Sequence, residues 1–188
     1  MIRKLLLVAS AALLLGGCEE PISDVSTPRM IPALEETSGD WIRTKVHTDG
    51  MLADLGYGTD HPFRVNQEVF VAPYQDGKND IRRGDIVLFA VSNPDSQQKT
   101  DIARVVGLPG ETIEIRKGTV SIDGTRLDAF YGSDSSISNG DSWSPVSLGV
   151  DDYYLLADIR WRGFHDSQTS GGFSSQDILG RVVGYPKK

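Results

Sequence analysis

The segments RGDIVLF at residues 83–89 and RVVGLPGET at residues 104–112 decide the fold of this 188-residue chain. Each contains a short run rich in β-branched and other apolar residues, a pattern that favours buried β-strands. Gly84 permits a tight turn into the first run, because glycine tolerates positive φ. In the second segment Pro109 fixes φ, and the glycines around it allow the chain to reverse. The two segments therefore predict strands joined to their neighbours by tight turns.

Similar runs continue on both sides of these segments. Gly-containing turns at residues 117–118 and 123–124 separate several of them, and helical periodicity is scarce, with one turn expected at residues 174–177. Short strands joined by glycine turns are typical of a β-barrel or a β-sandwich. We therefore predict one mainly β domain with little helix over residues 41–188, from which the Gly-, Ser- and Asp-rich residues 131–149 extend as an exposed excursion. Strands are expected at residues 69–71, 86–89, 103–107, 112–115, 119–122, 153–157 and 178–183.

The N-terminus has the pattern of a secretory leader. Arg3 and Lys4 precede an uncharged, mostly apolar run at residues 5–15. This run is too short to cross a hydrocarbon layer of about 30 Å, which takes about 20 helical residues. A signal peptide is therefore the preferred interpretation, and a buried N-terminal helix is an alternative.

The sequence LGGC at residues 15–18 resembles the lipobox of bacterial lipoproteins, in which the cysteine is lipidated after cleavage. The alternative is an ordinary signal peptide with an incidental cysteine. We expect residues 1–17 to be removed, Cys18 to carry the lipid anchor, and residues 18–40 to form a flexible tether rich in Pro, Ser, Thr and acidic residues. Because Glu19 rather than an aspartate follows the cysteine, the resemblance implies the outer membrane, facing the periplasm, if the source is Gram-negative.

Composition excludes several classes of function. A single cysteine rules out an intrachain disulfide framework and a cysteine-rich zinc module. The formal net charge of −7 disfavours nucleic acid as a partner, since binding to phosphates needs excess cations. His47, Asp49, Asp54, Asp60 and His61 lie close in sequence, but polar residues on an irregular loop explain them more simply than a metal site does. We therefore expect no metal and no cofactor.

Three collinear stretches resemble the type I signal peptidases, membrane-bound serine proteases that use a Ser–Lys dyad. The family's RGDIVxF box matches residues 83–89, and its KRVxGLPGDxV box matches residues 104–112. Its terminal GDN…DSR box, with a trailing I-x-G-[KR] strand, matches residues 157–159, 166–168 and 178–182, although the arginine of DSR is replaced by Gln168. These matches cover about residues 42–185 and imply a signal-peptidase-like β fold.

The resemblance also places the family's catalytic residues, and neither of the required side chains is present. The nucleophilic serine of the S-x-S-M motif corresponds to Gly50, and the general-base lysine before RVxGLPG corresponds to Ala103. A Ser–Lys dyad works because a buried lysine loses its proton and then accepts one from the hydroxyl. Glycine has no side chain that can attack, and alanine accepts no proton. We therefore predict a pseudoenzyme without catalytic residues.

In the family, the substrate lies extended beside the strands that line the site, as an added strand would. We therefore predict a retained groove that binds an extended peptide or a protein partner of the cell envelope without cutting it. Such a protein would act as a scaffold or chaperone, for example in the assembly of a pilus or conjugation apparatus. The predicted groove residues are Asp49, Gly50, Met51, Ala103, Arg104, Val105 and Val106.

Two alternatives stay open. Thr48 lies two residues before the nucleophile position, on the same face if the segment is extended, and would make the chain an active peptidase with a relocated nucleophile. Alternatively, an insertion at residues 56–64 fills the groove, and the protein is a purely structural lipoprotein of the envelope. Order and burial of this insertion would favour the second alternative.

Overall fold

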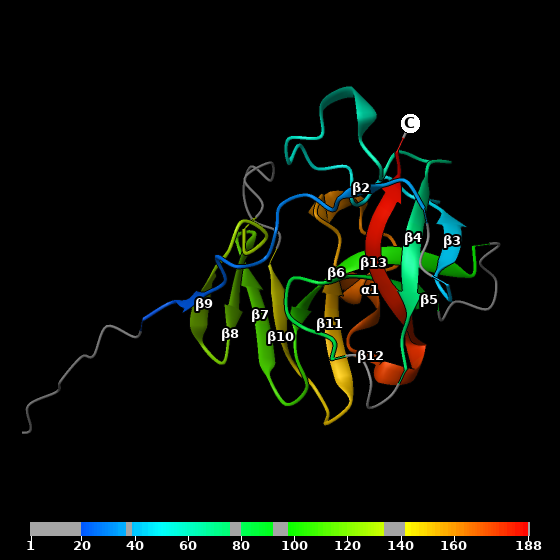
Figure 1. The fold of residues 1–188 in the computed structure, drawn as a ribbon. Helices are drawn as coiled ribbons and strands as arrows, with labels where there is room; N and C mark the ends of the chain where they lie inside the picture. The colour runs from blue at the N-terminus through cyan, green and yellow to red at the C-terminus, as the bar shows by residue number, and fades with distance from the viewer. Residues whose placement is uncertain (1–19, 37–38, 76–79, 92–97, 134–141, 188) are drawn as a thin grey trace, which may run out of the picture.

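The computed structural model describes residues 20–36, 39–75, 80–91, 98–133 and 142–187, so the predicted signal peptide and Cys18 lie outside the described residues. Two β-sheets lie side by side in this part of the chain (Figure 1). The described helices are the one-turn α1 (Ser167–Ser170) and the 3-10 turns η1 (Gly58–Asp60), η2 (Arg160–Arg162) and η3 (Ser175–Asp177). The prediction of a mainly β domain with little helix is confirmed. Across these residues, no helix has the length and apolar character needed to span a bilayer.

The larger sheet has eight strands, which pair antiparallel in the order β12-β11-β6-β5-β13-β4-β3, while β2 joins β13 in parallel. The predicted strands of both quoted segments lie near its centre. Gly84, at φ +87°, donates its N–H to the carbonyl of Val105 over 2.8 Å and so joins the two segments. The strands are β2 (Ala33–Leu34), β3 (Ile42–Lys45), β4 (Glu68–Pro73), β5 (Ile86–Ala90), β6 (Thr100–Gly107), β11 (Asp152–Leu156), β12 (Phe173–Ser174) and β13 (Ile178–Pro186).

Both faces of β6 are buried. Side chains alternate along a strand, so Ile102 packs with Met51 and Phe63 on one face. Ala103 packs with Phe89 on the other face. This central strand therefore separates two apolar clusters, one on each of its sides.

The smaller sheet has the order β1-β9-β8-β7-β10. Its two hairpins turn at Lys117-Gly118 and Asp123-Gly124, and all four residues have positive φ. Positive φ at both central residues is the type I′ geometry that suits two-residue hairpins, so the predicted turns are confirmed. The strands are β1 (Ile22–Ser23), β7 (Thr112–Arg116), β8 (Thr119–Ile122), β9 (Thr125–Asp128) and β10 (Trp143–Ser147).

The predicted excursion at residues 131–149 is wrong at both of its ends. Tyr131 and Leu148 are buried, and β10 pairs with β7 at the edge of the smaller sheet. The register shifts between Trp143 and Val146, so the sequence lacks the alternation that marks a regular strand. The middle of the excursion, residues 134–141, lies outside the described residues.

The predicted tether at residues 18–40 is wrong for residues 20–36, which are built into the domain. β1 pairs in parallel with β9, and β2 pairs in parallel with β13. The chain between them crosses from the smaller sheet to the larger one (Figure 1). Strands of two residues leave no periodic pattern in a sequence, which is why composition alone indicated a linker.

Candidate functional site

The predicted nucleophile position, Gly50, is packed against the chain that follows β11. Its carbonyl accepts the N–H of Ile159 over 2.8 Å. A β-carbon built on Gly50 would lie 3.1 Å from the β-carbon of Ala157 and 3.2 Å from the carbonyl oxygen of Arg162. Both separations are shorter than nine in ten β-carbon contacts in known proteins. A side chain at this position would therefore require Ala157 or the backbone of Arg162 to shift by a few tenths of an ångström.

The predicted base position, Ala103, lies on β6 opposite Val87 of β5 and is 1% exposed. Its methyl group belongs to an apolar cluster with Phe89, Leu155 and Phe173. Burial among such groups would lower the pKa of an amine, which is the environment that a lysine base requires. Ala103 itself has no amine, so no proton acceptor stands at the predicted base position.

The next residue on the same strand, Arg104, forms a buried ion pair with Asp158. Its Nε and Nη2 donate to the two oxygens of Asp158, each over 2.7 Å, and its Nη1 donates to the carbonyl of Gly84 over 2.8 Å. Burial by itself would lower the pKa of Arg104, but the charge of Asp158 and its hydrogen bonds raise it above the usual value. Such a paired, fully bonded guanidinium positions backbone and carries out no proton transfer. It joins the strand of the RVxGLPG box to the terminal box.

The second acidic residue of the terminal box, Asp166, organises the loop around it. One oxygen accepts the N–H of Ala157 over 2.9 Å, and the other accepts the N–H of Gln168 over 2.9 Å at the start of α1. The side-chain amide of Gln168 lies 3.1 and 3.3 Å from these oxygens and also donates to the carbonyl of Arg160. Gln168 thus replaces the expected arginine with a neutral donor. Burial raises the pKa of Asp166 to about 6, although these hydrogen bonds oppose the rise.

The proposed alternative nucleophile, Thr48, donates its hydroxyl to Asp101 over 2.8 Å. The other oxygen of Asp101 lies 3.0 Å from Nδ1 of His165. In a catalytic triad the imidazole, not the carboxylate, takes the proton of the hydroxyl. A carboxylate is also a far weaker base than a neutral amine or imidazole. Asp101 lies between Thr48 and His165 and holds them together. Because the hydroxyl of Thr48 meets the carboxylate and not the imidazole, this arrangement does not activate Thr48.

A single segment, residues 159–165, covers the nucleophile position, and we call it the cover segment. It is held by the hydrogen bond from Ile159 to Gly50, by an ion pair of 2.5 Å between Arg162 and Asp49, and by the contact from His165 to Asp101. Sequence reasoning missed Asp101 and did not place His165 beside it. The available signal was Asp101 itself, an acidic residue directly before the apolar run of β6.

The predicted groove is not open. Met51, Ala103, Arg104, Val105 and Val106 are each 1% exposed or less, and Gly50 is buried as well. Asp49 alone among the seven predicted groove residues is partly exposed, and it pairs with the cover segment. Because both faces of β6 are packed against apolar clusters, its side chains cannot line a solvent-filled groove. The prediction is therefore wrong for these six positions.

The insertion at residues 56–64 is packed against the same region. Phe63 and His61 are buried, and Phe63 joins the apolar cluster of Met51. Nε2 of His61 lies 2.8 Å from the carbonyl of Ala53, and its ring stacks at a tilt against Tyr57. Residues 61–63 are buried as expected of a self-filled site, whereas residues 58–60 of the same loop are exposed.

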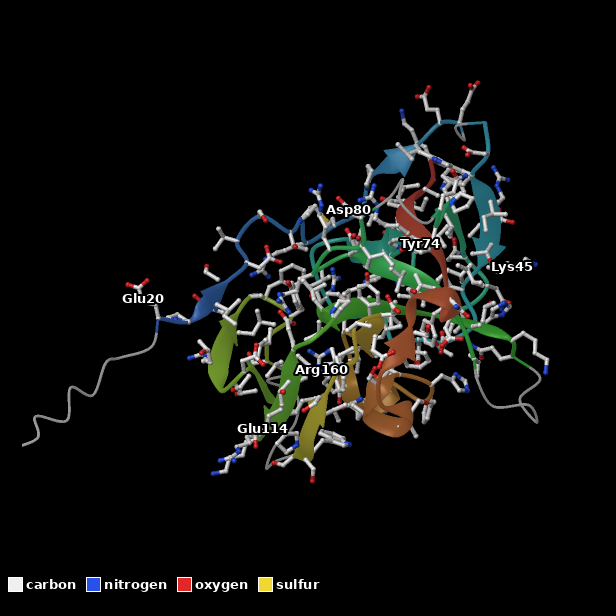
Figure 2. All side chains as sticks on the ribbon, turned by 90° about the horizontal axis from the view of Figure 1, so that it is seen from below. Glu20, Lys45, Tyr74, Asp80, Glu114 and Arg160 are labelled. Carbon is white, nitrogen blue, oxygen red and sulfur yellow. The ribbon has the colours of Figure 1, made fainter. Side chains whose placement is uncertain are left out.

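Over the ranges that the structure describes, no group of three His, Cys, Asp or Glu residues is arranged to hold a metal ion. Arg160 lies among the side chains in the middle of the molecule (Figure 2), and its guanidinium donates to the carbonyls of Ala157 and Tyr131. Its charge is therefore used to hold backbone beside the site.

Comparison with known proteins gives a consistent family. Residues 52–185 match the family model described as "Signal peptidase, peptidase S26", and the match begins just after Gly50. Signal peptidase I of Leptolyngbya laminosa is 33% identical over 124 residues, which cover 63% of this chain and 59% of the relative. Signal peptidase I P of Bacillus subtilis subsp. natto is 27% identical over 122 residues, which cover 61% and 64%. The chain thus spans about three fifths of the length of these relatives.

A solved structure was also found among signal peptidases. The signal peptidase I of Enterococcus faecalis aligns with 55% of this chain and 97% of its own, at 24% identity and a TM-score of 0.45.

Proposed function

Because this chain belongs to the signal peptidase family, peptidase S26, we propose that it is a member without Ser–Lys chemistry that serves as a structural scaffold of the cell envelope. Membership of the family suggests association with the envelope or the membrane. The lipobox at residues 15–18 supports attachment through a lipid on Cys18. If the source is Gram-negative, Glu19 favours the outer membrane, facing the periplasm.

The observation that carries this proposal is the packing at Gly50. The nucleophile position lacks a side chain, and a β-carbon there would meet Ala157 and Arg162 at 3.1 and 3.2 Å. Its partner position, Ala103, holds a methyl group in an apolar cluster. Losing one member of a catalytic unit typically costs about 10³- to 10⁶-fold in rate, and both members are replaced.

The closed site favours a structural role over an open peptide groove. The cover segment contacts Asp49 and Gly50, and Phe63 of the insertion at residues 56–64 packs in the same cluster as Met51. The surface of the cover segment, however, carries two large exposed aromatic side chains, Trp161 and Phe164, at 58% and 63% exposure. Exposed aromatic groups on a fixed segment are typical of contact sites for protein partners. We therefore place the partner surface on the outside of the cover segment.

An activity assay tests the loss of chemistry. The purified full-length protein in lipid vesicles is incubated with a preprotein that carries a cleavable leader and, separately, with a probe that acylates active serines and threonines. We expect neither cleavage nor labelling, while an active signal peptidase I processes the same preprotein. Cleavage that is lost in Thr48→Ala and kept in Thr48→Ser would overturn the proposal and establish Thr48 as the nucleophile.

Site-specific photocrosslinking in the native cell tests the scaffold role. A photoreactive amino acid placed at Trp161 or Phe164 is expected to give a discrete adduct with an envelope protein. The matched control is Val150, which is 87% exposed but lies outside the cover segment. Equal crosslinking from all three positions, or none from Trp161 and Phe164, would contradict a partner surface on the cover segment.

A further inference from the structure

The N-terminal end of the described chain is fixed to the outer edge of the smaller sheet. Ile22 pairs with Leu127 of β9, and the N–H of Asp24 donates to the carbonyl of Asp128 over 3.0 Å. Glu20 lies beyond this edge, on the outer side of the molecule, in the view of Figure 2. The described chain therefore begins beside β9.

A carboxylate holds this segment in place. The oxygens of Asp24 accept the N–H groups of Ser26 and Thr27 over 3.2 and 3.1 Å and the hydroxyl of Thr27. They also accept the hydroxyl of Tyr131, a buried residue of the smaller sheet's core. These bonds form a compact turn that is tied to the domain.

Three further contacts continue the attachment. The side chain of Thr27 packs against Gly84. A β-carbon added at Gly84 would lie 2.1 Å from the hydroxyl oxygen of Thr27. The guanidinium of Arg29 lies 5.2 Å from the ring centre of Phe130. The N–H of Ile31 donates to the hydroxyl of Tyr57 over 2.6 Å. Beyond Ile31 the chain enters β2, so residues 22–34 are bound to the domain along their whole length.

This attachment begins only four positions after Cys18, at Ile22. Four residues span at most about 14 Å when fully extended. A free linker over residues 18–40 would instead separate domain and lipid by about 26 Å on average and allow many orientations. We infer that the β1–β9 edge of the smaller sheet is a membrane-apposed surface, held against the lipid bilayer in one orientation by the docked segment. This inference rests on the lipid anchor at Cys18 in the proposed function.

The residues at this edge follow from the parallel register. Because Ile22 lies beside Leu127, the residue that leads into β1 lies beside Arg126, which is exposed. Val25, just after β1, is 90% exposed. β3 lies far from this edge, on the opposite side of the fold (Figure 1). The bilayer should thus be close to Arg126 and distant from Arg43 of β3.

Energy transfer to the membrane measures this difference. The acylated protein is bound to vesicles that contain an acceptor-labelled lipid, and a donor is attached to Arg126→Cys or, as the matched control, to Arg43→Cys. Both side chains are exposed, and an acylated Cys18 has no free thiol to react with the donor. We expect clearly stronger transfer from position 126 than from position 43. Equal transfer from the two positions would overturn the inference.

Two insertion variants distinguish a docked N-terminal segment from a flexible tether. Twenty Gly/Ser residues placed between Glu20 and Pro21 add about 25 Å of reach before the docked segment. The same insertion between Gly39 and Asp40 adds this reach after the docked segment instead. We expect transfer from position 126 to fall only with the first insertion. Equal falls with both insertions, or a fall with neither, would overturn the inference.

The failure of the anchor is distinguishable from the failure of the docking. Wild-type protein should sediment with membranes and Cys18→Ser should not. Wild-type protein that remains soluble would overturn the anchor and, with it, the apposed surface. Acylated protein whose position 126 lies far from the bilayer would overturn the apposed surface alone. Neither result bears on the peptidase assay.

Discussion

Two neighbouring residues of β6, Ala103 and Arg104, have different environments: Arg104 forms a buried ion pair, and Ala103 packs among apolar side chains. Arg104 keeps its full side chain in a buried, bidentate pair with Asp158 that joins the RVxGLPG box to the terminal box. Ala103 keeps only a methyl group in an apolar environment that would suit a lysine. The Arg104 side chain lies beside Asp158, and the Ala103 methyl group lies in an apolar cluster at the predicted base position. One strand thus carries a buried ion pair that links two segments at one position and a purely apolar contact at the next.

The largest expected effect comes from breaking the buried ion pair between Arg104 and Asp158. Removing one partner of a buried ion pair leaves an uncompensated charge, so Asp158→Ala should lower the free energy of unfolding by about 3–5 kcal/mol. Glu114→Ala provides the matched control, since its partner Arg116 is 77% exposed and such pairs contribute less than about 1 kcal/mol. Chemical denaturation of both variants measures the difference. Similar losses in the two variants would show that the buried pair does not stabilise the fold.

The free energy of unfolding should also change by about 3 kcal/mol with pH because of Asp166, which organises the loop beside Gly50. Burial raises the pKa of this carboxyl from 3.8 to about 6 in the folded protein. Its contribution to stability is therefore fully present below pH 3.8 and is lost as the pH rises through about 6, at 1.36 kcal/mol per unit of pKa difference. Relative to Asp166→Asn, the wild type should lose up to about 3 kcal/mol between pH 4 and pH 7.5 in denaturation experiments.

Gln168→Arg is the matched variant for this prediction. A guanidinium beside Asp166 would stabilise the ionised carboxylate and lower its pKa, so the stability lost between about pH 4 and pH 6 should shrink. A pH dependence that is the same in Gln168→Arg, Asp166→Asn and the wild type would exclude Asp166 as its source.

The next expected effect tests the space at the nucleophile position. Gly50→Ala forces a β-carbon against Ala157 and the backbone of Arg162, and overpacking of this kind costs about 1–3 kcal/mol. Gly39→Ala is the control, because a β-carbon added at Gly39 would have no heavy atom within 4 Å. The melting temperature should fall for the first variant alone. The double variant Gly50→Ser, Ala103→Lys should also fail to cleave a preprotein; cleavage by it would mean that the site opens easily.

The sequence predicted the regular parts of this molecule well, because periodicity reports local structure. Strands with alternating or continuous apolar residues and the glycine turns at Gly84 and Gly124 were predicted correctly. Contacts between distant segments leave no such pattern. Thr48 and Asp101 are 53 residues apart, and Asp101 and His165 are 64 residues apart, yet they meet at the site. The predicted catalytic positions, Gly50 and Ala103, came from family resemblance, whereas the packing around them required the structure.

The smallest expected effect concerns the docked N-terminal segment, residues 22–34, which pairs with β9 and β13. Burial alone would raise the pKa of Asp24, but hydrogen bonds from Thr27, Tyr131 and Ser26 lower it to about 2. The contribution of this carboxylate is therefore present above pH 3.8 and is lost as the pH falls towards 2. Tyr131→Phe removes one donor and should cost about 1 kcal/mol.

Because Tyr131→Phe loosens a local attachment, its effect should appear as faster hydrogen exchange in residues 22–34, with little change in the larger sheet. Tyr74→Phe, which alters a hydroxyl next to β4 of the larger sheet, is the matched control. Unchanged exchange in Tyr131→Phe would mean that strand pairing with β9 and β13 holds the segment without help from Asp24. Faster exchange throughout the chain would instead make the segment part of the cooperative core, so that the folded unit begins at residue 22 rather than at residue 41.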